Sequence, residues 1–137
     1  MTKKKNLIIT ILLAIFFIAT FFMPALKGPL GMDLNGATVF GVQFSTILFV
    51  DSVTEYAWFL FNSLTNLWVV LLLLWSLRGK VKMIPTFILV LLAGMSCWSW
   101  LASMESGVLL YGYWLWSISI IMISAFAIYR TRTPRIS

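Results

Sequence analysis

Five polar side chains that can bind ions or polar solutes fall within one short segment of the chain. At about 100° per residue they lie within about 100° of one another on a single helix face, namely Asp51, Glu55, Asn62, Thr65 and Asn66. This polar stripe of two carboxylates followed by amides suits a cation or a polar solute. The structural alternative is that the two amides bond to Ser or Thr on neighbouring helices, while Glu55 caps its own helix. The sequence leaves both interpretations open.

Groups that carry out catalysis are scarce. The chain has no His, a single cysteine, Cys97, and only four acidic residues, Asp33, Asp51, Glu55 and Glu105. It contains no Gly-rich phosphate loop, HExxH motif or CxxC motif. One cysteine without His excludes an intramolecular disulfide and a Cys–His zinc site. We therefore expect no enzymatic activity, no metal and no cofactor. A membrane enzyme acting on lipid would need at least one of the four carboxylates.

The composition assigns these polar groups to a membrane protein. Of the 137 residues, 61% are hydrophobic and 10% are charged, whereas a soluble domain has about 25% charged residues. Four apolar segments have lengths near the roughly 17–25 residues that cross a bilayer, at 7–23, 53–77, 83–104 and 108–129. We expect an all-α membrane protein, a four-transmembrane-helix bundle that forms one domain over residues 1–137.

The basic residues predict the orientation of this bundle. Nine of the ten fall on one side of the predicted topology: Lys3, Lys4, Lys5, Arg78, Lys80, Lys82, Arg130, Arg132 and Arg135. Lys27 and all four acids fall on the other side. The positive-inside rule then makes both termini cytoplasmic, and a bacterial inner membrane is the expected location. The basic balance therefore indicates topology or contact with anionic lipid, and we expect no nucleic-acid partner.

The outer loop, residues 24–52, is the largest segment outside the predicted helices. Asn35-Gly36 is a strong hairpin-turn signal, and the β-favouring runs 37–40 and 42–46 follow it. These residues predict a small β-hairpin, with a re-entrant loop as the alternative because 46–50 is apolar. Ser52 and Glu55 have the spacing of a capping box, which predicts a helix that begins at residue 53.

Small residues are frequent in the third and fourth predicted helices. They include Ala93, Gly94, Ser96, Cys97 and Ser99, followed by Ser117, Ser119 and Ser124. Close packing of helix backbones explains them, and a hydroxyl-lined pore is the alternative. Most Trp and Tyr residues fall near the outer ends of the predicted helices, as in an interfacial aromatic belt.

The expected function follows from this combination of features. In topology the chain resembles the claudin-like tetraspan proteins, but residues 24–52 contain neither the Trp nor the Cys of that family's first-loop signature. We expect a small non-enzymatic polytopic membrane protein that acts through helix and outer-loop interactions, as an accessory subunit, immunity-type protein or structural tetraspan. Its partners would be the lipid bilayer and either another protein or a second copy of itself. The alternative is a homo-oligomeric channel or small-solute transporter that uses the polar stripe.

Overall fold

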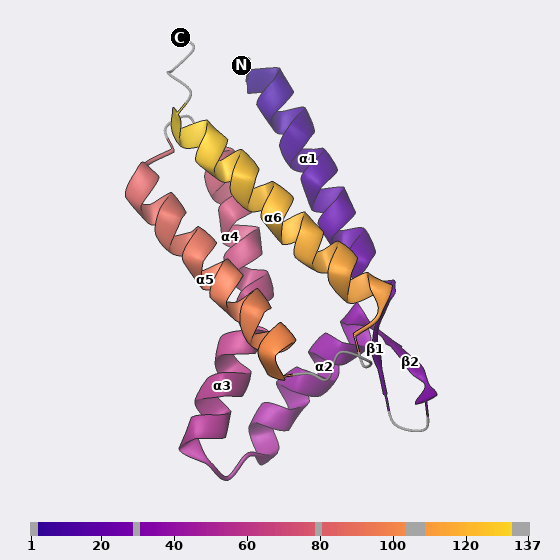
Figure 1. Cartoon of the computed structure of the whole chain (residues 1–137). Coiled ribbons are helices and arrows are strands. Elements are labelled where there is room, and N and C mark those ends of the chain that lie inside the picture. Colours follow the sequence, from indigo (N-terminus) through magenta and orange to yellow (C-terminus); the bar gives the residue numbers. More distant parts are fainter. Residues whose placement is uncertain (1–2, 29–30, 79–80, 104–108, 133–137) are drawn as a thin grey trace.

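The computed structural model describes residues 3–28, 31–78, 81–103 and 109–132. The elements in chain order are α1 (Lys3–Thr20), β1 (Pro24–Lys27), β2 (Asp33–Asn35), α2 (Gly36–Thr46), a 3-10 turn (Ile47–Phe49), α3 (Val53–Ser63), α4 (Thr65–Ser76), α5 (Met83–Ser103) and α6 (Tyr111–Arg132). In Figure 1 the long helices form a bundle, and the strands, α2 and α3 gather at one end of it. We call this the hairpin end. The opposite end, where α1 begins and α6 finishes, is the basic end.

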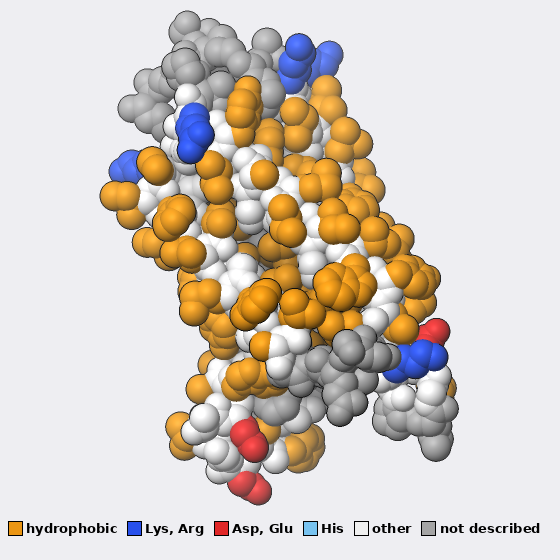
Figure 2. Space-filling model, in the orientation of Figure 1, with side chains coloured by type: hydrophobic (Ala, Val, Ile, Leu, Met, Phe, Trp, Pro, Cys, Tyr) orange, Lys and Arg blue, Asp and Glu red, His pale blue; other side chains and the backbone are white. Residues whose placement is uncertain are grey.

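Three of the described helical segments are long and apolar enough to cross a membrane: Val53–Ser76, Met83–Ala102 and Tyr111–Arg132. α1 differs because lysines occupy the first three of its 18 residues. The remaining fifteen rise about 22 Å, which is less than the roughly 30 Å of a hydrocarbon core. Large apolar side chains point outward along the bundle (Figure 2), as expected for helices whose surroundings are lipid.

The predicted segment 7–23 corresponds to α1, which begins and ends earlier than expected. After Thr20 the chain turns through residues 21–23 and enters β1 at Pro24. Proline has no backbone N–H and its ring clashes with the preceding turn, so it cannot continue the helix. α5 matches the predicted segment 83–104 to within one residue, whereas α6 begins and ends three residues later than the predicted segment 108–129.

A β-hairpin is present in the outer loop, but the prediction of which residues form it was wrong. β1 pairs antiparallel with β2, with Lys27 opposite Asp33 and Leu26 opposite Leu34. The connection between the strands includes Gly31, whose φ of 75° favours glycine. The predicted turn, Asn35-Gly36, lies after the second strand, and the predicted strands at 37–46 form α2.

Asn35 explains this difference. Its side-chain oxygen accepts a hydrogen bond from the backbone N–H of Thr38 at 2.8 Å. This is the bond made by an asparagine at a helix N-cap. Asn-Gly is therefore a helix start here, although the same dipeptide favours a hairpin turn when strands flank it on both sides.

The predicted helix 53–77 is interrupted at Leu64, between α3 and α4. Two side chains next to the break bond to backbone carbonyls of the preceding turn. The Thr65 hydroxyl donates to the Asn62 carbonyl at 2.7 Å, and the Asn62 amide donates to the Trp58 carbonyl at 2.9 Å. Such bonds bend helices, which accounts for the interruption without a proline.

The start of α3 was predicted correctly, but the predicted capping bond was not. Ser52 occupies the N-cap and α3 begins at Val53, yet the Ser52 side chain makes no capping hydrogen bond. Its backbone carbonyl instead accepts from the Tyr56 N–H at 2.9 Å, as the first bond of the helix. The apolar run after residue 52 therefore begins the helix without a capping box.

The bundle has one main core and one smaller core. The main core is shared by α1, α4, α5 and α6 and contains Leu13, Phe17, Val69, Leu72, Leu73, Ala93, Ile120, Ile123 and Ala127. The smaller core, at the hairpin end, contains Leu26, Trp100, Leu109 and Tyr113. It therefore joins β1 to the end of α5 and the start of α6.

A backbone junction fixes the hairpin to α6. Leu26 and Leu109 form an antiparallel bridge, and the Leu110 N–H donates to the Ala25 carbonyl at 2.9 Å. At Gly112 a Cβ atom would lie only 2.3 Å from the Pro24 carbonyl oxygen. Only glycine allows the two backbones to approach this closely.

Candidate binding site

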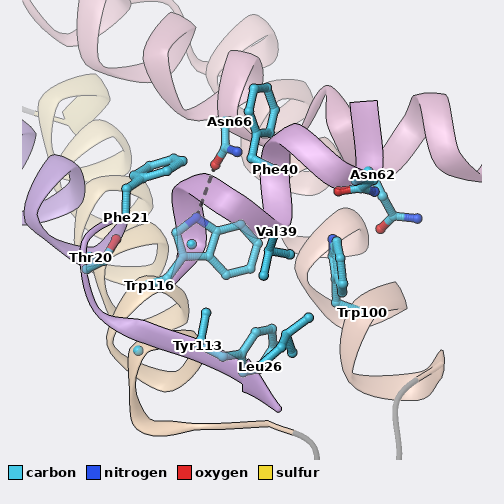
Figure 3. A pocket seen from close by; sticks show the side chains of 14 residues that line it. Thr20, Phe21, Leu26, Val39, Phe40, Asn62, Asn66, Trp100, Tyr113 and Trp116 are labelled. Carbon is cyan, nitrogen blue, oxygen red and sulfur yellow. Dashed lines mark hydrogen bonds between the residues drawn. The ribbon is translucent and has the colours of Figure 1, made fainter. Parts of the chain in front are cut away.

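A small, partly open cavity of about 60 Å³ lies at the hairpin end (Figure 3). One water needs about 10–15 Å³ measured in this way, so the space holds several water molecules or part of a larger ligand. Its lining residues come from the six helices, from β1 and from the turn after α1: Thr20, Phe21, Ala25, Leu26, Gly36, Val39, Phe40, Gln43, Asn62, Asn66, Trp100, Gly112, Tyr113 and Trp116. None of these residues carries a charge.

α2 supplies one continuous wall of the cavity. Gly36, Val39, Phe40 and Gln43 follow the spacing i, i+3, i+4, i+7, which places them on one face of a helix. The opposite face of α2 includes exposed side chains such as Val42 and Phe44. The helical conformation of residues 36–46 therefore places these side chains on the cavity wall. In the predicted strands, alternate residues would have pointed away from the cavity.

The two amides of the polar stripe reach this cavity, and both bond to neighbouring helices. The Asn62 side-chain oxygen accepts from the Ser99 hydroxyl of α5. The Asn66 oxygen accepts from the Trp116 indole N–H of α6 at 3.1 Å, the dashed bond in Figure 3. These are the interhelical bonds expected when amides join helices. Thr65 is fully buried and does not line the cavity.

The two carboxylates of the stripe lie apart from the amides. Asp51 and Glu55 are both exposed, before and within the first turn of α3. Neither lines the cavity. The structure thus brings Asn62 and Asn66 together and leaves the acids at the surface of the hairpin end.

Gln43 is a polar lining residue that was not a candidate from the sequence. Its side chain is only 6% exposed, and its amide nitrogen has no hydrogen-bond partner within the described residues. The strand prediction gave it no special position. Helical spacing from Gly36 would have placed it beside Val39 and Phe40, and a buried amide on an apolar face indicates either a bonding partner or a ligand.

The basic residues divide into exposed side chains and one with a structural role. Those that are exposed are Lys4, Lys5, Arg78, Lys82 and Arg132. Three predicted members, the side chain of Lys3 together with Lys80 and Arg135, lie outside the described part of the chain. In Figure 2 the basic side chains gather mainly at the basic end, and the acidic ones lie at the hairpin end.

Arg130 joins three helices at the basic end. Its guanidinium donates to the Ser76 carbonyl, at the end of α4, at 3.5 Å and to the Arg78 carbonyl, just after α4, at 3.1 Å. A cation at this position also interacts favourably with the helix dipole. With its amide oxygen turned toward α6, buried Asn6 of α1 accepts from the same guanidinium at 2.8 Å.

Two small residues of α5 and α6, Cys97 and Ser117, contact one another, whereas Gly94 is exposed. The Cys97 thiol donates to the Ser117 hydroxyl at 3.3 Å, and the Tyr113 hydroxyl donates to the Cys97 carbonyl at 2.9 Å. These polar groups therefore form hydrogen bonds between the two helices. They do not line the cavity, apart from Tyr113 at its edge.

The cavity combines apolar walls with uncharged hydrogen-bonding groups. Apolar side chains form its walls, and amide, hydroxyl and indole groups supply its polarity. Across the described residues, no cluster of three or more His, Cys, Asp or Glu could hold a metal. No protein-family model matches the chain, and neither a curated protein nor a solved structure is significantly similar to it.

Proposed function

We propose that this chain is a small, non-enzymatic integral membrane protein that acts by binding, as an accessory subunit, immunity-type protein or structural tetraspan. Four transmembrane helices are proposed, with α1 lengthened across the bilayer by the apolar residues 21–23. The separation of basic and acidic ends supports cytoplasmic termini by the positive-inside rule. We place the protein in a bacterial inner membrane, with its hairpin end on the outer side.

The observation that carries this proposal is the pairing of polar groups between helices. The Asn62–Ser99 bond joins α3 to α5, and the Asn66–Trp116 bond joins α4 to α6. Polar groups used in this way hold a bundle together. The hairpin end, with its cavity, then remains as the part of the molecule available for a partner or a lipid.

The alternative is a homo-oligomeric channel or transporter that uses the polar stripe. It is favoured by the exposure of Asp51 and Glu55 at one end of that stripe. It is disfavoured by the burial of Thr65 and by the interhelical bonds of the two amides. A path along the stripe would require these bonds to open.

Native mass spectrometry after gentle extraction from the membrane tests the proposal. A different chain present at fixed stoichiometry is the expected result, and liposomes containing the purified protein should remain impermeable to ions. The double variant Asn62→Leu/Asn66→Leu should weaken assembly without changing ion flux. A homo-oligomer with a conductance that falls in Asp51→Asn or Glu55→Gln, but not in the control Asp33→Asn, would establish the channel instead.

A further inference from the structure

Gln43 lines the cavity and carries a buried hydrogen-bond donor. The side chain is more than nine-tenths buried, and no acceptor in the described part of the chain bonds to its amide nitrogen. Buried amides are almost always bonded, because an unsatisfied donor loses its bonds to water without compensation. The acceptor that this donor lacks can sit in the cavity that Gln43 lines, once the side chain rotates to turn its amide nitrogen toward that space.

The walls define the chemistry of that acceptor. Side chains around the space are largely apolar, including Phe21, Val39 and Phe40, and the whole lining is uncharged. A phosphate or a carboxylate would be buried there without a cation to pair with it, which is costly. The acceptor is therefore a neutral oxygen attached to an apolar body.

The position of the cavity along the bundle further limits which ligand could supply this oxygen. Its lining comes from the ends of long helices, with Thr20 at the end of α1, Trp100 near the end of α5 and Tyr113 near the start of α6. Trp and Tyr mark the level where hydrocarbon meets the polar headgroup region. The ester carbonyls that link acyl chains to a lipid backbone lie at this same level.

We propose that the cavity binds the acyl-ester region of a neutral lipid, with the Gln43 amide donating to the ester carbonyl. The first methylene groups of the acyl chain would then lie against Phe40 and Trp116, two residues of the lining (Figure 3). This inference rests on the proposed function, since it requires the hairpin end to sit at a membrane surface. It identifies the class of ligand that the hairpin end would bind.

Binding of two matched lipids to the purified full chain tests the inference. The probes are a monoacylglycerol and the alkyl-ether analogue of equal chain length, which lacks the carbonyl, titrated in detergent and quantified by native mass spectrometry. We expect the ester to bind about five- to tenfold more tightly, the range expected for one hydrogen bond to a buried donor. Gln43→Met, which keeps the size and removes the donor, should abolish this preference.

Two further variants distinguish lipid binding in the cavity from lipid binding elsewhere on the surface. Ser45→Ala, on the exposed part of α2, should keep the full ester preference. Val39→Trp should fill the cavity and weaken binding of both lipids. Since the preference compares two ligands on the same protein, it remains decisive in the unchanged chain even if a variant fails to fold.

Three results would overturn the inference. Equal binding of ester and ether by the unchanged chain would mean that water satisfies Gln43. An ester preference that survives in Gln43→Met would place the lipid elsewhere. Loss of binding of both lipids only when a co-purified chain is present would assign the cavity to a protein segment. None of these outcomes alters the stoichiometry or the ion flux that test the proposed function.

Discussion

At the basic end the guanidinium of Arg130 bonds to the Ser76 and Arg78 carbonyls, whereas at the hairpin end the buried amide nitrogen of Gln43 has no hydrogen-bond partner among the described residues. Buried hydroxyls near the basic end also bond to backbone carbonyls, as Thr10 does to Asn6 and Thr86 to Lys82. The basic end is therefore a satisfied structure that holds helices together. Among the described residues, the buried polar atoms without a partner belong to Gln43, Ser63, Trp68 and Ser96, and of these four only Gln43 lines the cavity.

The largest expected effect comes from forcing apart the backbone junction between β1 and α6, which supports the hairpin end. Gly112→Ala would place a Cβ atom against the Pro24 carbonyl, so the two backbones must separate. We expect a loss of about 2–3 kcal/mol in the free energy of unfolding, as for overpacked sites. Denaturant titration in detergent, followed by circular dichroism, measures this loss.

Gly94→Ala is the matched control for this substitution. Gly94 lies in α5, and no neighbouring atom would lie within 4 Å of an added Cβ. Alanine favours helix more than glycine does, so this variant should be neutral or slightly stabilising. Equal destabilisation by both substitutions would show that the close approach of β1 to α6 is not required.

At the basic end, the corresponding test is Arg130→Met. The substitution keeps an apolar stem and removes the bonds to Ser76, Arg78 and Asn6. We expect the free energy of unfolding to fall by about 1–2 kcal/mol, since bonds from a charged donor are lost at a partly exposed site. Arg132→Met, at an exposed position of the same helix, should change it by less than about 0.5 kcal/mol. A similar loss in both variants would mean that net charge, and not these bonds, stabilises this end.

Gln43→Met, in contrast, should raise the free energy of unfolding. In lipid-free detergent the variant removes a buried donor that has no partner, so the protein should gain about 1 kcal/mol of stability. Adding the monoacylglycerol should reduce this advantage, because only the unchanged chain forms the proposed bond. A variant less stable than the unchanged chain in lipid-free detergent would show that the Gln43 amide is already satisfied, which would remove the contrast between the two ends.

The smallest expected effect concerns the bond between Asn62 and Ser99. A double-mutant cycle with Asn62→Leu and Ser99→Ala should give a coupling energy of about 0.6 kcal/mol, typical of interhelical hydrogen bonds in membranes. The unfolding free energies of the four proteins in detergent provide the measurement. A coupling near zero would indicate that the two side chains act independently and would weaken the helix-packing interpretation of the stripe.

Sequence reasoning worked best where a long segment has one environment. α5 was predicted closely because its apolar run is continuous, and apolar length indicates whether a helix can cross a bilayer. It was less successful at the hairpin end, where Asn35-Gly36 is compatible with two structures. The pairing of β1 with β2 and with Leu109 decides between them, and such contacts between distant residues leave no local pattern.

The candidate site was predicted only in part for the same reason. The helical periodicity of residues 51–66 placed Asn62 and Asn66 on one face, and both line the cavity. The same periodicity also included Asp51 and Glu55, which lie outside the cavity because they belong to the exposed start of α3. Gln43 was not identified because residues 37–46 were predicted to form strands, whereas its place in the cavity depends on their helical conformation.

The bridge between Leu26 and Leu109 has a consequence for the order in which the protein is made. Synthesis proceeds from the N-terminus, so the first three long helices emerge before Leu109, the bridge partner of Leu26, exists. Contacts between residues so far apart in the chain form slowly, because a large loop must close before they are gained. The final helix therefore completes the walls of the cavity, and a nascent chain that stops before Tyr111 has no site to fill.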